Sequence, residues 1–399
     1  MRRTTCRGCD GSRLEQFLDL GQMPLAGGFL EDTRSVAAER RYPLQAFVCS
    51  DCGLVQILEV VDPRVLFTQY SFSSSTVSPL VAHFERYAEW LSQRFEPGTV
   101  IEFGCNDGIL LGPLVGLGIR AVGIDLSENI TAMARAKGFD VITGCFDART
   151  ADTLRQRLGP VDVVTGSNAF AHNDRPDVIL DAARRVLRPG GALCLEMMYA
   201  GDLLETLQWD TLYHEHLTFY GLGSLSRLIE RHGFTVVHAE RIPMHGGSLR
   251  VVATTETEAA PAPSVSSILE YERGVRLDDP ETWKAFGRRV NRAIRVTSEV
   301  LGKIARGSRI WGYGAAGKAT LWVNACKMDY LEAIADSSPL RAGRLMPGTH
   351  TPIRYPEELR ANPPDYIFLT AWNYSGVIRS KEDWFDGVWV APLPELRFF

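Results

Sequence analysis

Residues 100–111 constrain the fold of this chain more than any other stretch. An apolar run leads to Glu102, glycines follow at positions 104 and 108, and apolar residues resume behind them. This order predicts a strand, a tight turn and a helix, the first unit of a doubly wound parallel sheet with a ligand crevice at the carboxyl end of its strands. Gly104 and Gly108 have no Cβ atom, so the backbone of the turn can approach a ligand closely there.

A second apolar run, residues 121–124, ends at Asp125. A carboxylate in that place is positioned to hold the hydroxyl groups of a ribose. The turn after Glu102 lacks the third glycine and the spacing of a dinucleotide fingerprint, and it lacks the lysine of a phosphate-binding loop. The alternative interpretation is an α/β domain whose glycine turn binds nothing.

Together the two segments resemble the S-adenosylmethionine site of the Rossmann-like methyltransferases. The resemblance implies an α/β fold with a Rossmann-like methyltransferase core, and S-adenosylmethionine (SAM) as the cofactor. The residues that it implies for cofactor binding are Glu102, Gly104, Asn106, Asp107, Gly108, Asp125, Leu126 and Asn168. Asn168 belongs to the loop beyond the expected fourth strand, which in methyltransferases of this topology lies close to the sulfonium of the cofactor.

Four of the eight cysteines form two C-x-x-C pairs, Cys6 with Cys9 and Cys49 with Cys52. In a reducing compartment, two such pairs indicate a zinc site rather than disulfides. Four thiolates complete a tetrahedral zinc ion and leave no open position for catalysis, so the predicted metal is structural. Redox pairs or chance pairs are the alternative. The remaining cysteines are expected to be small buried apolar side chains: Cys105, Cys145, Cys194 and Cys326.

The length and charge of the chain limit the number of domains and the kinds of partner that it can have. With 399 residues, two or three domains are expected. A net charge of −5, without any block of Lys or Arg, argues against nucleic acid or an anionic membrane as partner. No run approaches the ~20 apolar residues of a membrane span, and the first residues lead into no signal-peptide core. We expect a cytoplasmic protein that is a monomer or a weak homo-oligomer.

The order of motifs divides the chain into three expected domains. Residues 1–75 alternate short β-like runs with turns around the cysteine pairs, and they are expected to bind zinc. Residues 76–258 begin with a helix near Ser78 and continue with alternating strands and helices, as the SAM-binding domain requires. Residues 259–399 begin with a linker rich in Ala and Pro and then form a second α/β unit.

That second unit contains another glycine turn between a strand and a helix. Gly312, Gly314 and Gly317 have the G-x-G-x-x-G spacing, which by itself is a weak signal. No acidic residue clearly ends a following strand, so a second nucleotide cofactor is not predicted. Lys318, at the head of the helix, is placed to meet a phosphate group.

Several strings of the chain resemble the sugar C-methyltransferases that act on nucleotide-linked 4-keto deoxysugars in antibiotic biosynthesis. The resemblance runs nearly from end to end, and its most specific strings are residues 213–217 (Tyr-His-Glu-His-Leu) and 245–250 (His-Gly-Gly-Ser-Leu-Arg). Gly317 departs from the family, which more often carries Ala, Ser or Thr at that position. The resemblance implies a small zinc-binding domain, a SAM-binding core, and a C-terminal Rossmann-like domain that helps to hold the nucleotide diphosphate.

The expected chemistry needs a general base, because a carbon atom next to a ketone becomes nucleophilic only when its proton is removed. We expect His216 to be that base, with Glu215 and Tyr213 orienting it or polarising the ketone, and His172 as the second candidate. In an extended conformation His214 and His216 would share one side, so the segment must turn if the cluster is to face one substrate. A structural polar turn, or a metal site at the two histidines, is the alternative.

The expected substrate is a thymidine-diphosphate-linked 4-keto-6-deoxy sugar, with a 2,6-dideoxy sugar favoured. C3 is the favoured carbon and C5, on the other side of the ketone, is the alternative. The expected substrate-binding residues are Tyr70, Ser73, His245, Ser248, Arg250, Lys318 and Asn373. Two other classes remain open: a zinc-containing nucleotide-sugar-binding protein with a vestigial cofactor site, and a nucleic-acid methyltransferase that uses zinc for recognition.

Overall fold

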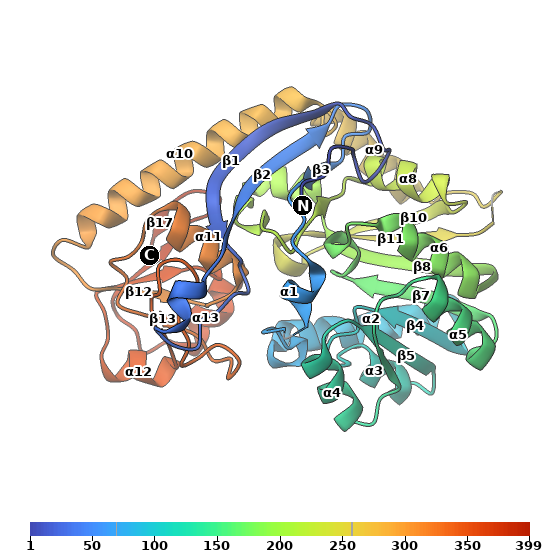
Figure 1. Cartoon of the computed structure of the whole chain (residues 1–399), viewed down its shortest axis with the longest axis horizontal. Helices are drawn as coiled ribbons and strands as arrows, with labels where there is room; N and C mark the ends of the chain where they lie inside the picture. Colours follow the sequence, from blue (N-terminus) through green and yellow to red (C-terminus); the bar gives the residue numbers. More distant parts are fainter. Residues whose placement is uncertain (69, 257) are drawn as a thin grey trace.

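The computed structural model of the chain describes residues 1–68, 70–256 and 258–399. Two α/β sheets lie at opposite ends of the molecule, and the N-terminal strands run between them (Figure 1). This arrangement confirms the expected Rossmann-like core with a second Rossmann-like unit. None of the described helices combines the length and the apolar character that a bilayer span requires.

The N-terminal sheet is antiparallel and includes a strand from far along the chain. Its order is β1-β2-β3-β9, with bounds β1 (Leu14–Pro24), β2 (Arg41–Cys49), β3 (Val55–Ile57) and β9 (Thr218–Phe219). The pairing of Val55 with Phe219 brings the chain just beyond residues 213–217 onto this sheet. Short helices accompany the sheet: η1 (Ser35–Ala38) and α1 (Pro63–Phe67).

The central sheet has the order β10-β11-β8-β7-β4-β5-β6. Its strands are β4 (Thr99–Phe103), β5 (Arg120–Asp125), β6 (Val141–Thr143), β7 (Val161–Ser167), β8 (Leu187–Met198), β10 (Thr235–Ile242) and β11 (Ser248–Thr254). The five strands from β4 to β8 are parallel and β10 and β11 are antiparallel additions. The parallel strands are nearly continuous apolar runs because helices cover both faces.

Two helices of the central unit lie where the sequence predicted them. The first, α2, starts at Ser78 with Pro79 in its first turn, a position at which proline loses no hydrogen bond. The glycine turn after β4 leads to α3, so the strand, turn and helix predicted for residues 100–111 are confirmed. The helices are α2 (Ser78–Phe95), α3 (Leu111–Gly116), α4 (Glu128–Ala136), α5 (Ala148–Leu158), α6 (Pro176–Val186), α7 (Ala200–Thr206) and α8 (Leu222–Arg231).

Two helices, α9 (Pro263–Gly274) and α10 (Pro280–Ile304), lead to the C-terminal sheet, whose order is β14-β13-β12-β15-β16-β17. Its strands are β12 (Ile310–Tyr313), β13 (Ile334–Ala335), β14 (Ile353–Arg354), β15 (Tyr366–Leu369), β16 (Val388–Ala391) and β17 (Arg397–Phe398). Its helices are α11 (Gly317–Ala325), α12 (Pro356–Ala361), η6 (Trp372–Tyr374) and α13 (Ser375–Lys381).

The six strands of the C-terminal sheet repeat the order of six of the seven strands of the central sheet, all but β10. From the edge inward, β6-β5-β4-β7-β8-β11 corresponds to β14-β13-β12-β15-β16-β17. In each sheet the first five strands are parallel and the sixth is antiparallel. In each sheet the strand order reverses beside the first strand of the unit, β4 or β12. The carboxyl ends of the strands at such a reversal are where doubly wound folds bind ligands.

The N-terminal residues share apolar cores with both sheets. Cys6, Cys49 and Cys52 pack in the cluster that fills one face of the central sheet. Phe17 of β1 packs instead with Trp283 of α10, in the cluster that reaches the C-terminal sheet. The long helix α10 runs beside β1 (Figure 1). The N-terminal segment therefore connects the other two parts of the molecule.

Candidate active site

The first glycine turn has the backbone that its sequence predicted. Gly104 and Gly108 have φ angles of 69° and 83°, values that favour glycine. A Cβ atom on Gly104 would collide with Ala169 in the loop after β7, and one on Gly108 would collide with the ring of Phe139. The two glycines are therefore required by the backbone conformation of the turn and by its close packing against Ala169 and Phe139.

Asp125 ends β5 beside this turn. Its Oδ2 accepts a hydrogen bond from the Asn106 backbone N–H at 3.0 Å, and its Oδ1 accepts one from Ser127 N–H at 2.9 Å. Each carboxylate oxygen can accept a further hydrogen bond, because a carboxylate offers about four lone pairs. Leu126 follows in the same turn. The carboxylate is thus fixed in orientation and still able to receive two hydroxyl groups.

Three other acceptors in this crevice are buried and accept no hydrogen bond from any residue that the structure describes: Glu102 Oε2, Asp107 Oδ1 and Asn168 Oδ1. Burial, with Asp125 and Asp107 nearby, raises the pKa of Glu102 well above its usual value. A buried acceptor without a donor costs free energy. The hydroxyl and ammonium groups of SAM are donors, so this set of residues fits SAM.

Residues 70–76 lie over the glycine turn. Ser73 donates from Oγ to Asp107 Oδ2 at 2.7 Å, and Ser74 N–H donates to Asn106 Oδ1 at 2.9 Å. Asn129 of α4 exchanges two hydrogen bonds with the backbone of Tyr70, at 2.9 and 3.0 Å. Ser73, expected to bind substrate, is thus bound to an expected cofactor residue, whereas the ring of Tyr70 extends toward Glu215.

The segment with the densest titratable groups turns, as the sequence required. His216 N–H donates to the Tyr213 carbonyl at 2.8 Å. The turn places the rings of Tyr213 and His216 4.0 Å apart, whereas His214 lies against the N-terminal sheet, with Nε2 3.2 Å from the Pro43 carbonyl. His214 is therefore separated from the cluster. The two histidine rings have different neighbours, Pro43 for His214 and Thr211 for His216, which argues against a metal ion shared by both.

His216 has a defined tautomer. Its Nδ1 lies 2.7 Å from the Thr211 carbonyl, and since a carbonyl only accepts, Nδ1 carries the proton and Nε2 keeps its lone pair. Burial, with His172 nearby, lowers the pKa of His216 well below its usual value. The ring of His172 is 4.9 Å from that of His216, and burial lowers its pKa to about 4. Both imidazoles are thus neutral at physiological pH.

Glu215 completes this side of the cluster. Its Oε1 accepts from the Gly27 backbone N–H at 3.0 Å, and its Oε2 accepts from the Tyr70 hydroxyl at 3.5 Å. Burial raises the pKa of Glu215 to about 7. Gly27, which follows β1, was not among the predicted site residues. The carboxyl group is oriented by the N-terminal segment and by the segment over the glycine turn.

The C-terminal unit meets the cluster through the start of α11. A Cβ atom on Gly317 would lie 3.0 Å from Cζ of Tyr213, so the glycine that departs from the family leaves room for this ring. Lys318 Nζ lies 4.6 Å from the centre of the Trp372 ring and makes no hydrogen bond within the described residues. Burial lowers the pKa of Lys318, and the carboxylate of Asp210 opposes this effect. A buried ammonium without an acceptor is suited to a negatively charged ligand.

Asp210 binds two tryptophan side chains of the C-terminal unit near Lys318, and it was not among the predicted site residues. Its Oδ2 accepts from the indole N–H groups of Trp322 and Trp372 at 2.9 and 2.7 Å. Because Asp210 lies one residue before Thr211, which accepts from His216, this anchor also supports the base. A sequence signal was present, since Asp210 opens the same titratable cluster.

The remaining expected residues have separate positions. His245 has φ of 54°, and burial lowers its pKa to about 4. Ser248 donates to the Met244 carbonyl at 3.0 Å. Arg250 is held by two carboxylates, with Nε 2.6 Å from Glu196 Oε1. Asn373 lies in η6 next to Trp372. The structure therefore groups Tyr70, His172, Tyr213, Glu215 and His216, and it engages Ser248 and Arg250 within the protein.

The expectation that no acidic residue follows the strand after the second glycine turn is wrong. Asp336 directly follows β13, and its Oδ2 accepts from Ala315 N–H at 2.7 Å while its Oδ1 accepts from Ser338 N–H at 2.8 Å. These are the same two kinds of contact that Asp125 makes. The run of residues 333–335 before it was the available signal, but a strand of two residues is too short to recognise by pattern.

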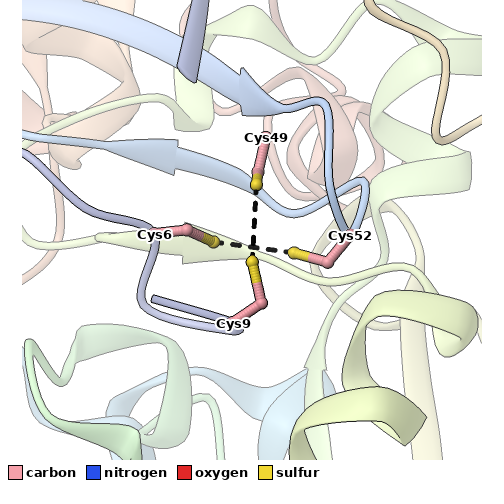
Figure 2. Close-up of side chains that lie close together, drawn as sticks. All are labelled: Cys6, Cys9, Cys49 and Cys52. Carbon is pink, nitrogen blue, oxygen red and sulfur yellow. Dashed lines mark hydrogen bonds between the residues drawn. The ribbon is translucent and has the colours of Figure 1, made fainter. Parts of the chain in front are cut away.

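The four cysteines of the two C-x-x-C pairs converge (Figure 2). Their sulfur atoms all lie within 4.8 Å of one another, and the Cys6–Cys52 and Cys9–Cys49 sulfur distances are both 3.6 Å. A tetrahedral zinc ion with bonds of ~2.3 Å requires sulfur separations of ~3.8 Å, so the four thiolates fit it. Gln56 Nε2, 3.1 Å from Cys6 Sγ, supports one ligand.

Of the four other cysteines, three are buried as expected. Cys145 differs: it is exposed in the loop before α5. The expectation of a buried apolar role is wrong for this residue, because the loop after the short strand β6 carries it outside the sheet.

Comparisons with known proteins cover nearly the whole length of the chain. Family models match a zinc binding domain at residues 6–67, a methyltransferase domain at 80–239, and a C-methyltransferase C-terminal domain at 243–394. The C-methyltransferase NovU of Streptomyces niveus is 32% identical over 402 residues, covering 98% of this chain and 96% of its own.

Two further similarities each cover less than half of this chain. A ubiquinone biosynthesis O-methyltransferase of Paraburkholderia xenovorans is 34% identical over 95 residues, covering 23% of this chain and 41% of its own. A SAM-dependent methyltransferase from Archaeoglobus fulgidus, known by its crystal structure, is 15% identical with a TM-score of 0.37, covering 44% of this chain and 93% of its own.

Proposed function

Because the chain belongs to the SAM-dependent C-methyltransferases, we propose that it methylates a carbon atom of a thymidine-diphosphate-linked 4-keto-6-deoxy sugar. C3 is the favoured position and a 2,6-dideoxy sugar the favoured substrate, in the biosynthesis of an antibiotic or related secondary metabolite. Bound SAM supplies an electrophilic methyl group to a carbon nucleophile. The observation that carries the proposal is the buried cluster around His216. In this cluster His172 follows β7 of the central sheet, and Tyr213 lies against Gly317 at the start of α11 in the C-terminal unit.

In this proposal, Nε2 of His216 takes the proton from the carbon next to the ketone. Its lone pair is free because Nδ1–H is bound to the Thr211 carbonyl. The negative charge that develops on the ketone oxygen needs a donor, and the hydroxyl of Tyr213, beside the His216 ring, is positioned to supply it. Glu215 orients the Tyr70 hydroxyl on the other side. Burial of the cluster excludes water and strengthens these interactions.

The nucleotide end of the substrate is proposed to bind at the C-terminal unit. The buried ammonium of Lys318, at the start of α11, would pair with a diphosphate oxygen. His245 and Asn373 are the further candidates for substrate contacts. A cytoplasmic location suits the four zinc-binding thiolates, which stay reduced there.

The substrate proposal is tested by incubating the enzyme and SAM with thymidine-diphosphate sugars that carry a 4-keto group, with and without a 2-hydroxyl. Mass spectrometry should detect a product heavier by one methyl group, and NMR should place that group on C3. Methylation at C5 would favour the alternative position. Transfer to an oxygen or nitrogen atom, or no transfer to any of these sugars, would contradict the proposal.

Replacing Asp125 by Ala should weaken SAM binding. The change removes the acceptor of two ribose hydroxyls, and a hydrogen bond to a charged group contributes roughly 1.5–3 kcal/mol, or about 10- to 150-fold in affinity. Isothermal calorimetry measures the effect. Asp140→Ala is the matched control, because Asp140 precedes β6 at the opposite edge of the same sheet. Equal affinities for the two variants would contradict the ribose assignment.

Replacing Gly317 by Ala should reduce turnover without reducing stability. Alanine favours a helix over glycine by about 0.5–1 kcal/mol, but its Cβ would press on Tyr213. A displaced catalytic ring is expected to cost about tenfold in turnover. Gly302→Ala, in α10 where the added atom meets open space, is the matched control. Methyl-transfer assays should show lower turnover for Gly317→Ala than for Gly302→Ala, while thermal unfolding should show no loss of stability in either variant. If both variants keep wild-type turnover, Tyr213 does not need this space.

A further inference from the structure

Arg7, one residue after the first zinc ligand, has a side chain that is completely buried. Its Nη1 donates to the Ile57 carbonyl of β3 at 2.6 Å, and its Nε donates to Asp174 Oδ1 at 3.0 Å. A buried guanidinium is costly unless such contacts hold it, so its position is tightly fixed. It joins the zinc site to a loop of the central sheet.

The carboxylate that Arg7 binds lies two residues after His172. Arg3 also donates to this residue, from Nη1 to the Asp174 carbonyl at 2.9 Å. On the other flank of His172, the Ala171 carbonyl accepts from Leu217 N–H at 2.9 Å. The His172 loop is therefore tied at one end to the N-terminal segment and at the other to the residue after His216.

The two attachments meet at one residue of β3. Ile57 N–H donates to the Leu217 carbonyl at 3.0 Å, and the Ile57 carbonyl accepts from Arg7. The strand therefore holds the segment that carries His216, and through Arg7 it also holds the loop that carries His172. The rings of His172 and His216, which these contacts hold from either side, are 4.9 Å apart.

We propose that Arg7 is a positioning residue, which holds His172 and His216 at the separation that proton removal requires. Because Arg7 follows the zinc ligand Cys6, the distance between the two histidines also depends on the structure of the zinc site. The inference rests on the proposed function, since it takes His216 as the base. Arginine suits this place because its planar fork reaches Ile57 and Asp174 together, whereas a lysine ammonium is a point charge on a flexible stem.

The test compares Arg7→Lys and Asp174→Asn with Arg13→Lys. Arg13 pairs with Asp51 in the same N-terminal segment but is exposed, so it is the matched control. Turnover is followed by loss of deuterium from the labelled sugar carbon, zinc by metal analysis, and SAM affinity by calorimetry. Imidazole resonances of protein labelled with ¹⁵N-histidine report ring positions without any reaction, assigned through His→Asn variants.

Arg7→Lys and Asp174→Asn should lower turnover by about 10- to 100-fold, because displacement of a reacting group by ~1 Å can cost that much. Zinc content and SAM affinity should stay at wild-type values. The resonances of His172 and His216 should shift, whereas that of His350, which pairs with Glu39, should stay. In a His216→Asn background the same changes should add little, since groups that act as a unit are non-additive.

Wild-type turnover in both variants, or unshifted His172 and His216 resonances, would overturn the proposal. Loss of turnover that only follows loss of zinc would also overturn it. Asp174 lies outside the zinc-binding segment, so Asp174→Asn decides the question if Arg7→Lys fails to fold. If the resonances shift while His216→Asn keeps wild-type deuterium loss, the assignment of the base fails and the positioning by Arg7 stands.

Discussion

His216→Asn will slow carbon methylation by about 10²–10⁴-fold, the usual contribution of a general base, while SAM affinity stays near its wild-type value. Asparagine preserves a side-chain donor of similar reach but provides no basic nitrogen. The decisive measurement is deuterium loss from the sugar carbon next to the ketone, because this step precedes methyl transfer. Burial lowers the pKa of His216, so the base is unprotonated at neutral pH and should lose its basic nitrogen only on acidification.

His232→Asn is the matched control for this variant. His232 lies after α8 and bonds to Asp181 at the surface, away from the cluster, so its replacement should leave turnover unchanged. If His216→Asn loses deuterium as fast as the wild type, the base lies elsewhere. His172, whose ring is 4.9 Å away, is then the residue to test.

Cys6→Ser or Cys52→Ser will lower the free energy of unfolding by several kcal/mol, seen as a fall of ~10 °C or more in the melting temperature. Each change removes one of four zinc ligands, and zinc binding is coupled to folding of the segment that it joins. Both residues also pack in the core of the central sheet, so the damage should spread into that sheet. Metal analysis should show zinc near one equivalent in the wild type and less in the variants.

Cys145→Ser tests that the effect is specific to the ligands. Cys145 is an exposed thiol outside the cysteine cluster, so this variant should keep both its zinc and its melting temperature. Removal of zinc from the wild-type protein with a chelator should lower the melting temperature as the Cys6→Ser and Cys52→Ser variants do. A metal-free protein that melts at the wild-type temperature would contradict a stabilising zinc ion.

Features fixed by residues close together were predictable from sequence. The turn of residues 100–111 was recognised because its glycines and Glu102 are neighbours, and Asp125 because it directly follows the apolar run of residues 121–124. The convergence of the cysteine pairs followed from zinc chemistry, which overrides the distance between them in the chain. The turn that separates His214 from His216 was anticipated only as a requirement of side-chain geometry.

Features that depend on distant partners were not predictable. Glu215 is oriented by Gly27, and Arg250 is held by Glu196 and Glu240; no pattern in one sequence reveals such partners. The two-residue strand before Asp336 is too short to show alternation or an apolar run. In each case the position of the side chain depends on tertiary contacts, and a local sequence pattern carries no information about those contacts.

The strand β9, which lies within the methyltransferase segment of the chain but pairs with β3, limits how relatives of this enzyme can be recombined. A chimaera that exchanges residues 1–75 alone would place a foreign edge against residues 218 and 219, and it would also replace Arg7 and Gly27, the partners of Asp174 and Glu215. Matching mutations at those contacts would have to accompany the exchange. Evolution of new substrate preferences by shuffling whole segments is therefore hindered, and gradual change at the shared contacts is the easier route.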